Sequence, residues 1–281
     1  MKYPFLLPGA EGKPIALDLF YEGNEPQPLV IYAHGFNGFK DWGSFDRIAA
    51  QFAAAGFAFI KFNFSHNGTT PEQPEEFVDP EAFGHNTYTK ELYDLQAVID
   101  WALDPSNGHA AAIDGNRLFL IGHSRGGGIV LLKGAEEPRI KGIATWASVA
   151  RCQTPWGSWP PEKLEAWKAA GVQYITNSRT KQQLPVYYSL YLDYQQNRER
   201  LDIPAQVARL RQPLLICHGT RDEAVPVERA HELKAAQPAA ELFLVDSDHV
   251  FGRKHPWTED QLPQATQQVV DRTIAFFKKI F

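Results

Sequence analysis

The stretch Leu118-Phe-Leu-Ile-Gly-His-Ser124-Arg-Gly-Gly-Gly128 is an apolar run that ends in the pattern Gly-x-Ser-x-Gly and continues into a segment able to begin a helix. This order predicts a strand, a sharp turn and a helix, with Ser124 at the apex of the turn. Such a turn lifts the serine hydroxyl above the end of a sheet, and small residues two positions before and after it leave room for a strained backbone. The alternative is an ordinary glycine-rich turn.

Other apolar runs alternate with helical patterns along the chain. Near-continuous apolar runs are typical of strands covered on both faces, as in a parallel sheet. Helical stripes recur between them, and one of these has Ser44 as a plausible N-cap and Gly56 as a plausible stop. We therefore predict an α/β fold with an open, mostly parallel central sheet flanked by helices, in a single domain over residues 1–281. The expected strands are 29–33, 57–64, 118–122, 142–147, 213–217 and 241–245, and the expected helices include 45–52, 88–99 and one within 259–281.

One segment interrupts this alternation. Residues from about 151 to 211 contain no strand-like run and are rich in Trp and Tyr among helical and proline-rich stretches. The segment falls between two predicted strands, so we expect an insertion rather than a separate domain. One interpretation is a helical excursion whose aromatic side chains pack on each other. We favour a helical cap over the C-terminal edge of the sheet, where open α/β folds bind ligands, with aromatic residues as walls of the pocket.

The composition narrows the possible classes of protein. Hydrophobic residues make up 44% and charged residues 22% of the 281 positions, as in soluble globular proteins. A net charge of -5 offers no basic surface for nucleic acid, and neither a signal peptide nor a membrane span is expected. Cys152 and Cys217 are too few for a disulfide framework, so we expect free thiols in a cytoplasmic protein.

A serine hydroxyl is a weak nucleophile at neutral pH and needs a base to take its proton. His249 follows the last predicted strand and precedes the C-terminal helix, which places it at the same sheet edge as Ser124. It is the histidine with the position and order that the pattern requires. His255 is its main competitor but lies further from the strand end, and a plain surface-loop histidine is the alternative.

The base in turn needs an acid that orients it. Asp222 follows the strand at 213–217 by a short turn, in His218-Gly-Thr-Arg-Asp222. Its carboxylate would fix the imidazole tautomer of the base, although an aspartate here also suits a helix cap. Asp246 and Asp248 flank the histidine too closely in sequence to be preferred.

Backbone amides are the expected donors to a developing oxyanion. One should come from Arg125, directly after the serine, and the other from a loop after an earlier strand. The sequence His34-Gly-Phe36-Asn-Gly38 follows the strand at 29–33 and nominates the amide of Phe36, whereas the alternative is a simple glycine turn.

The order Ser124, Asp222, His249 is that of the α/β-hydrolase fold, and the resemblance covers essentially the whole chain. More narrowly, the chain resembles bacterial esterases grouped with dienelactone hydrolases, prolyl-oligopeptidase-like serine hydrolases and cinnamoyl (feruloyl) esterases. The sequence at 34–38 and the aromatic insertion carry the similarity to the cinnamoyl esterases, while Ser124 stands where dienelactone hydrolases have cysteine.

The resemblance implies a serine hydrolase of carboxylic esters, with a Ser-His-Asp triad and an acyl-enzyme. The expected partner is a small-molecule ester, with aromatic or medium-length acyl groups favoured by Trp and Tyr walls, and the expected state is a monomer or homodimer. No metal or organic cofactor is implied, because neither a ligand cluster nor a dinucleotide motif is visible. The rival functions are an amidase or peptidase of the same fold and a non-catalytic binding protein.

Overall fold

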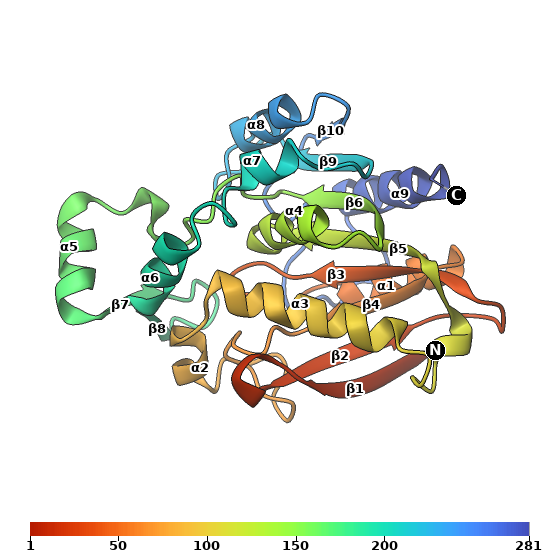
Figure 1. Cartoon of the computed structure of the whole chain (residues 1–281), viewed down its shortest axis with the longest axis horizontal. Coiled ribbons are helices and arrows are strands. Elements are labelled where there is room, and N and C mark those ends of the chain that lie inside the picture. Colours follow the sequence, from red (N-terminus) through yellow and green to blue (C-terminus); the bar gives the residue numbers. More distant parts are fainter. Residues whose placement is uncertain (281) are drawn as a thin grey trace.

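The computed structural model describes residues 1–280, and its centre is an eight-stranded sheet in the order β1-β2-β4-β3-β5-β6-β9-β10 (Figure 1). The strands from β4 to β10 in this order run parallel, whereas β2 is antiparallel to both β1 and β4. The predicted mostly parallel α/β sheet is therefore confirmed. The strands are β1 (Lys2–Pro8), β2 (Pro14–Phe20), β3 (Gln27–Ala33), β4 (Ala58–Phe62), β5 (Ile113–His123), β6 (Ile140–Trp146), β9 (Leu214–Gly219) and β10 (Glu241–Val245).

Helices cover both faces of the sheet, because alternate residues of its central strands point to opposite sides. In β3, Leu29 and Ile31 join the core under one set of helices, and Val30 and Tyr32 join the core under the other. The first set is α3 (Tyr88–Leu103), α4 (Arg125–Glu136) and α8 (Glu228–Ala236); the second is α1 (Phe45–Ala54) and α9 (Gln264–Lys278). A short helix, α2 (Pro80–Gly84), lies near the end of α3 (Figure 1).

The N-terminal hairpin of β1 and β2 was not among the predicted strands. Prolines at positions 4, 8 and 14 obscure its strand pattern. Proline is tolerated here because β1 is an edge strand, and its residues alternate between exposed and half-buried. The hairpin extends the sheet on the side away from β10.

The segment between β6 and β9, which we call the inserted segment (residues 147–213), projects beyond the sheet (Figure 1). The expectation that it contains no strand is wrong, because β7 (Val172–Thr176) and β8 (Gln183–Tyr187) pair as an antiparallel ribbon. β7 is half-exposed and contains polar residues, and β8 has only three buried positions with a proline among them, so neither strand gives a long buried run like those of the central sheet. The helices of this segment are α5 (Pro161–Ala170), α6 (Ser189–Gln196) and α7 (Ile203–Val207).

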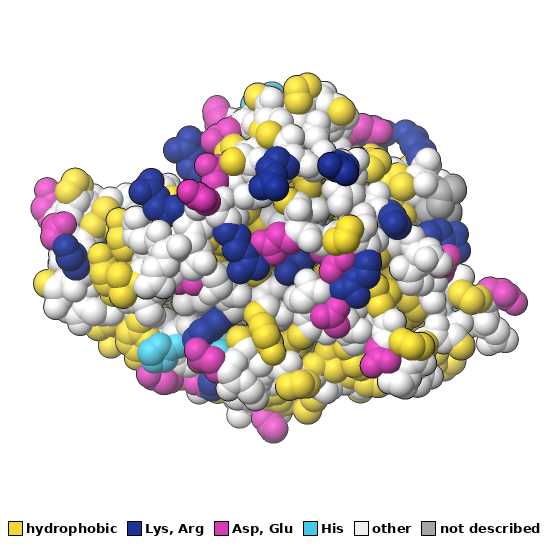
Figure 2. All heavy atoms as spheres, in the orientation of Figure 1, with side chains coloured by type: hydrophobic (Ala, Val, Ile, Leu, Met, Phe, Trp, Pro, Cys, Tyr) yellow, Lys and Arg dark blue, Asp and Glu magenta, His cyan; other side chains and the backbone are white. Residues whose placement is uncertain are grey.

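The surface carries charges of both signs. On the face shown in Figure 2, Lys and Arg side chains are interspersed with Asp and Glu side chains instead of gathering in one patch. In the described part of the chain, no helix combines the length and the apolar character needed to cross a bilayer.

Candidate active site

Ser124 occupies the turn between β5 and α4, so the predicted strand, turn and helix are all present. Its backbone has φ 55° and ψ -121°, a strained conformation for a residue other than glycine. The turn is fixed on both sides, because the Ser124 amide donates to the carbonyl of Trp146 (3.0 Å) and the Val149 amide donates to the carbonyl of Ser124 (3.2 Å). The serine is thereby held at the carboxyl end of the central strand.

The two glycines of the motif are required by close backbone contacts. A Cβ at Gly122 would lie 2.3 Å from the carbonyl oxygen of Gly126. A Cβ at Gly126 would lie 2.3 Å from the carbonyl oxygen of His34 and 2.4 Å from that of Ala33. The sharp turn therefore forms only because side chains are missing at both positions.

The structure brings His249 and Asp222 together, as the sequence predicted for these two residues. Nδ1 of His249 lies 2.7 Å from Oδ2 of Asp222, and the aspartate side chain is fully buried while the imidazole is 21% exposed. His249 and Ser124 line the same cavity. Within residues 1–280 no hydrogen bond joins the serine hydroxyl to the imidazole. Hydrogen bonds between catalytic groups often form fully only when a substrate binds.

Asp222 is held by a set of donors. Its Oδ1 accepts hydrogen bonds from the amides of Ala224 (2.9 Å) and Val225 (2.8 Å), and Nε2 of His218 lies 3.3 Å from its Oδ2. Burial alone would raise the pKa of Asp222, but the hydrogen bonds from His218, His249 and Val225 outweigh it and hold this pKa well below its usual range. Asp222 is therefore ionised at neutral pH and fixes His249 with a proton on Nδ1.

The competing residues of the sequence make other contacts, although His255 lines the same cavity as Ser124. Nδ1 of His255 accepts a hydrogen bond from the amide of Gly43 (3.0 Å). Asp246 forms an exposed ion pair with Arg221 (2.7 Å), and Asp248 accepts hydrogen bonds from backbone amides of its own loop. None of these three side chains contacts the His249 imidazole in the described part of the chain.

The two nominated oxyanion amides flank the serine. Gly35 packs against it so closely that a Cβ at Gly35 would lie 2.9 Å from the Cβ of Ser124, and Phe36 follows directly. His34 fixes this loop, because its Nδ1 bonds the carbonyl of Gly35 (2.8 Å) and its Nε2 accepts from the amide of Phe64 (3.3 Å). Burial lowers the pKa of His34 to about 4, so it is neutral. In the described residues the amides of Phe36 and Arg125 donate no hydrogen bond, which leaves both available.

The side chain of Arg125 points away from the cavity and is almost fully buried. Its Nε donates to Glu91 (2.9 Å), its Nη1 donates to the carbonyl of Thr154 (3.1 Å), and its guanidinium lies 3.9 Å from the Tyr88 ring centroid. Arg125 thus ties the residue after the serine to α3 and to the start of the inserted segment.

A cavity of about 370 Å³ opens beside Ser124 and His249. Its aromatic walls come from β3, the loop after it and neighbouring segments, whereas the inserted segment contributes Asn177, Ser178 and Arg179 from the turn between β7 and β8. The expectation that Trp and Tyr of this insertion form the walls is wrong for this cavity, because those rings pack mainly on each other. Trp156, Trp159, Trp167, Tyr188, Tyr191 and Tyr194 form that cluster.

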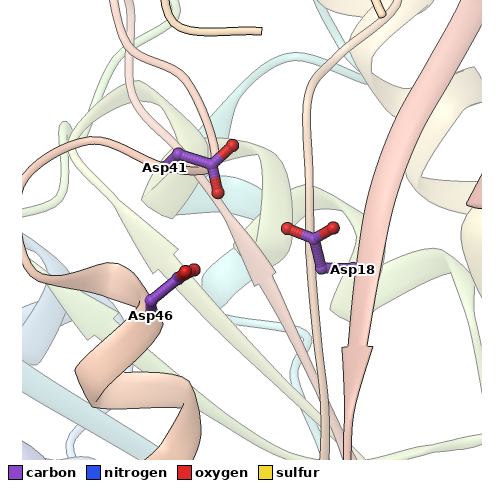
Figure 3. Close-up of side chains that lie close together, drawn as sticks. All are labelled: Asp18, Asp41 and Asp46. Atoms are coloured by element: carbon purple, nitrogen blue, oxygen red, sulfur yellow. The ribbon is translucent and has the colours of Figure 1, made fainter. Parts of the chain in front are cut away.

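The close group of acidic side chains in residues 1–280 is a different site. Asp18, Asp41 and Asp46 converge in Figure 3. Lysine ammonium groups already lie between these carboxylates: Lys40 is 2.5 Å from Asp18, and the fully buried Lys61 is 2.5 Å from Asp46. The cluster is therefore a network of ion pairs, and it gives no reason to place a metal ion.

His123, the residue directly before the serine, contacts the loop of the candidate base. Its Nε2 lies 3.0 Å from the carbonyl of His249, and the two rings are 4.8 Å apart between centroids. Burial and the charges of His249 and Arg253 lower the pKa of His123 well below its usual range. His123 and His218 thus support the site. In the sequence, only the position of His123 beside Ser124 and that of His218 at the end of a predicted strand pointed to this role.

The parallel sheet, the strained serine turn and the order of strands define an α/β hydrolase. A model of the serine aminopeptidase family, S33, matches residues 24–200, and the chain belongs to this family.

Curated relatives are more distant. The 2,6-dihydropseudooxynicotine hydrolase of Paenarthrobacter nicotinovorans is 26% identical over 88% of this chain and 61% of its own length. The quorum-quenching protein AidA of Acinetobacter baumannii is 28% identical over 41% of this chain and 34% of its own length. An uncharacterised 31.7 kDa protein of Escherichia coli is 31% identical over 46% of this chain and 40% of its own length. The chain thus spans less than two thirds of each of these relatives.

Solved structures agree on the fold. Est1E from Butyrivibrio proteoclasticus, with ferulic acid bound, has a TM-score of 0.71 and 19% identity over 98% of both chains. An esterase domain from Rhodothermus marinus has a TM-score of 0.64 and 18% identity over 99% of this chain and 98% of the other. The expected resemblance to α/β hydrolases of the esterase type is confirmed.

Proposed function

We propose that this protein is a serine hydrolase that cleaves carboxylic esters through Ser124, His249 and Asp222. The observation that carries the proposal is the buried Asp222–His249 pair, joined at 2.7 Å, in the same cavity as a serine on a strained turn. Membership of a hydrolase family supports the reaction class, and the esterases among the structural neighbours favour an ester.

Each residue has a defined part in this mechanism. His249 takes the proton of Ser124 as the hydroxyl attacks the acyl carbonyl, and Asp222 stabilises the imidazolium that forms. The amides of Phe36 and Arg125 donate to the oxyanion of the tetrahedral intermediate. His249 then protonates the leaving alcohol, and water activated by the same histidine releases the acid and frees Ser124.

The cavity indicates which acyl groups it accommodates. Its volume of about 370 Å³ and its walls of Phe36, Phe39, Trp42 and Phe77 suit an aromatic or medium-length acyl group. Long lipid chains would extend beyond such a space. Ranking p-nitrophenyl acetate, butyrate, octanoate and a feruloyl ester tests this point, and a sharp preference for long chains would contradict it.

An amide or peptide substrate is the second candidate, because the family that matches is named for an aminopeptidase. The same triad serves both bond types, so the leaving group distinguishes them. Aminoacyl p-nitroanilides assayed beside the matching esters decide between the two, and we expect the esters to be turned over faster.

The central test is turnover of p-nitrophenyl butyrate by the wild type and by Ser124→Ala. We expect the variant to lose roughly four orders of magnitude in kcat or more, because the members of a triad act as a unit. Ser148→Ala is a matched control, since Ser148 is a buried serine that bonds only the neighbouring carbonyl of Val149. Unchanged turnover in Ser124→Ala would exclude the proposed nucleophile.

A further inference from the structure

Arg253 stands in the wall of the cavity beside the candidate triad, four residues after His249. The residue is 4% exposed, and its Nε donates to the carbonyl of Val250 (2.8 Å). Its two terminal nitrogens, Nη1 and Nη2, are buried and have no hydrogen-bond partner in residues 1–280. An arginine keeps its charge inside a protein, so this is a buried cation whose strongest donors are unused.

The surroundings of Arg253 hold its guanidinium in place without neutralising it. The group lies 4.5 Å from the ring centroid of Phe45 and 5.6 Å from that of Trp42. The phenol of Tyr32 lies close enough to interact with the guanidinium, although no hydrogen bond of good geometry joins the two groups. Asp248 acts on the guanidinium as a more distant charge. Burial lowers the pKa of Arg253, an effect that a bound anion would oppose.

The cavity as a whole lacks an acidic wall. Within the described residues, Arg179, Arg253 and Lys254 line it, and no aspartate or glutamate does. Glu76 and Glu259 pair with Arg179 and Lys254 from outside the lining, whereas Arg253 has no such pair. Among the three cations of the lining, only Arg253 therefore lacks an ion-pair partner in the described residues.

We propose that Arg253 is a specificity-determining residue that binds a carboxylate of the substrate, so that the preferred substrates are esters that carry a free carboxylate. The inference rests on the proposed function and names the substrate class for the same site. Two parallel N–H groups on a planar guanidinium match the two oxygens of a carboxylate. The ion pair between the guanidinium and the carboxylate is stronger in the buried site than in bulk water. A buried charge without a partner also destabilises the protein, and a bound anion would relieve that cost.

The wild-type enzyme tests this without any mutation. Mono-p-nitrophenyl glutarate and p-nitrophenyl pentanoate have chains of similar length, with and without a carboxylate in the acyl group. For a carboxylate in the leaving group, 4-acetoxybenzoate is compared with 4-acetoxybenzamide. We expect kcat/KM to favour the acid in at least one pair by roughly tenfold or more. Turnover of all four esters with no preference for either acid overturns the inference while leaving the proposed function intact.

The variant Arg253→Gln assigns the preference to this residue. We expect the ratio of kcat/KM for the preferred acid to kcat/KM for its neutral partner to fall by at least roughly tenfold, and urea unfolding reports whether the variant is folded. Arg253→Lys keeps the charge without the planar fork and should lie between the two. Lys279→Gln removes one charge from an exposed side chain outside the cavity lining and should change the preference less than about twofold.

A binding measurement separates recognition from catalysis. Glutarate and pentanoate are titrated into Ser124→Ala and into Ser124→Ala combined with Arg253→Gln. We expect Ser124→Ala to bind glutarate more tightly than pentanoate. In the double variant we expect the two ligands to bind with similar affinity. Equal affinities of glutarate for the two variants would show that Arg253 is only structural.

Discussion

Nδ1 of His249 lies 2.7 Å from Oδ2 of Asp222, although 26 residues separate the two in the chain. The contact exists because β9 and β10 are parallel neighbours, so the loops that follow them meet at one edge of the sheet. The loops themselves touch as well, since the Arg221 amide donates to the carbonyl of Ser247 (2.9 Å). This relationship makes Asp222 the orienting acid of our proposal.

Asp222→Asn should leave the fold intact and lower kcat by roughly ten-thousandfold, as in a triad that loses its carboxylate. The amide cannot stabilise the imidazolium and favours the wrong tautomer of His249. Steady-state turnover of p-nitrophenyl butyrate measures the effect. Asp246→Asn is the matched control, because Asp246 forms only an exposed ion pair beside the same histidine loop. An active Asp222→Asn together with an inactive Asp246→Asn would reverse the assignment.

Gly126→Ala should destabilise the protein by about 1–3 kcal/mol or more and abolish most activity. The added Cβ would meet the carbonyl oxygens of His34 and Ala33 at 2.3 and 2.4 Å, and backbone atoms cannot rotate away as a side chain can. Urea unfolding and turnover of p-nitrophenyl butyrate are measured together. Gly108→Ala is the control, since nothing lies within 4 Å of a Cβ at Gly108. Equal stability of the two variants would contradict the tight elbow described above.

Sequence reasoning succeeded where burial is continuous. The runs at 29–33, 118–122 and 142–147 lie in or at the end of central strands that are covered by helices on both faces, so every position is buried and nearly all are apolar. The same logic placed Ser124, Asp222 and His249 at strand ends, and the parallel sheet brings those ends to one edge.

It failed where the signal depends on half-exposed strands or on packing between distant segments. Prolines in β1 and β8 and polar residues in β7 obscure short strands that lie at sheet edges. The aromatic residues of the inserted segment allowed two interpretations, and the sequence alone did not decide that Trp156 and Trp167 pack on each other instead of lining the cavity. Arg253 belongs to no recognisable sequence motif. That its terminal nitrogens lack hydrogen-bond partners follows only from its buried surroundings in the structure.

Lys61→Met should destabilise the protein by about 3–5 kcal/mol, because it removes the fully buried cation that all three carboxylates share. Lys61 is fully buried and lies 3.1 Å from Asp18 and 2.5 Å from Asp46, and it also bonds Asp41. Urea unfolding measures the loss. Lys2→Met is the matched control within the same cluster. Its side chain is 39% exposed, so we expect a loss below about 1 kcal/mol. Similar losses in both variants would mean that burial does not decide the strength of this network.

Asp94→Asn should change the dependence of stability on pH. Asp94 is 1% exposed and accepts hydrogen bonds from the amides of Ala10 and Ser65, both at 2.8 Å. Burial nevertheless raises its pKa from 3.8 to about 6. The folded state therefore holds this proton more tightly than the unfolded state. The resulting stabilisation is fully present below about pH 4 and is lost as the pH rises through about 6.

The wild type should thus lose about 2 kcal/mol of stability relative to Asp94→Asn between pH 4 and pH 7, since one pKa unit corresponds to about 1.4 kcal/mol and the unfolded carboxyl is already partly ionised at pH 4. The constant cost of replacing a hydrogen-bond acceptor cancels in this difference. Urea unfolding of both proteins across that range gives the measurement. Asp260→Asn, at a fully exposed side chain, should differ from the wild type by less than about 0.5 kcal/mol at every pH. A gap between wild type and Asp94→Asn that stays constant with pH would show that Asp94 titrates as an ordinary carboxyl group.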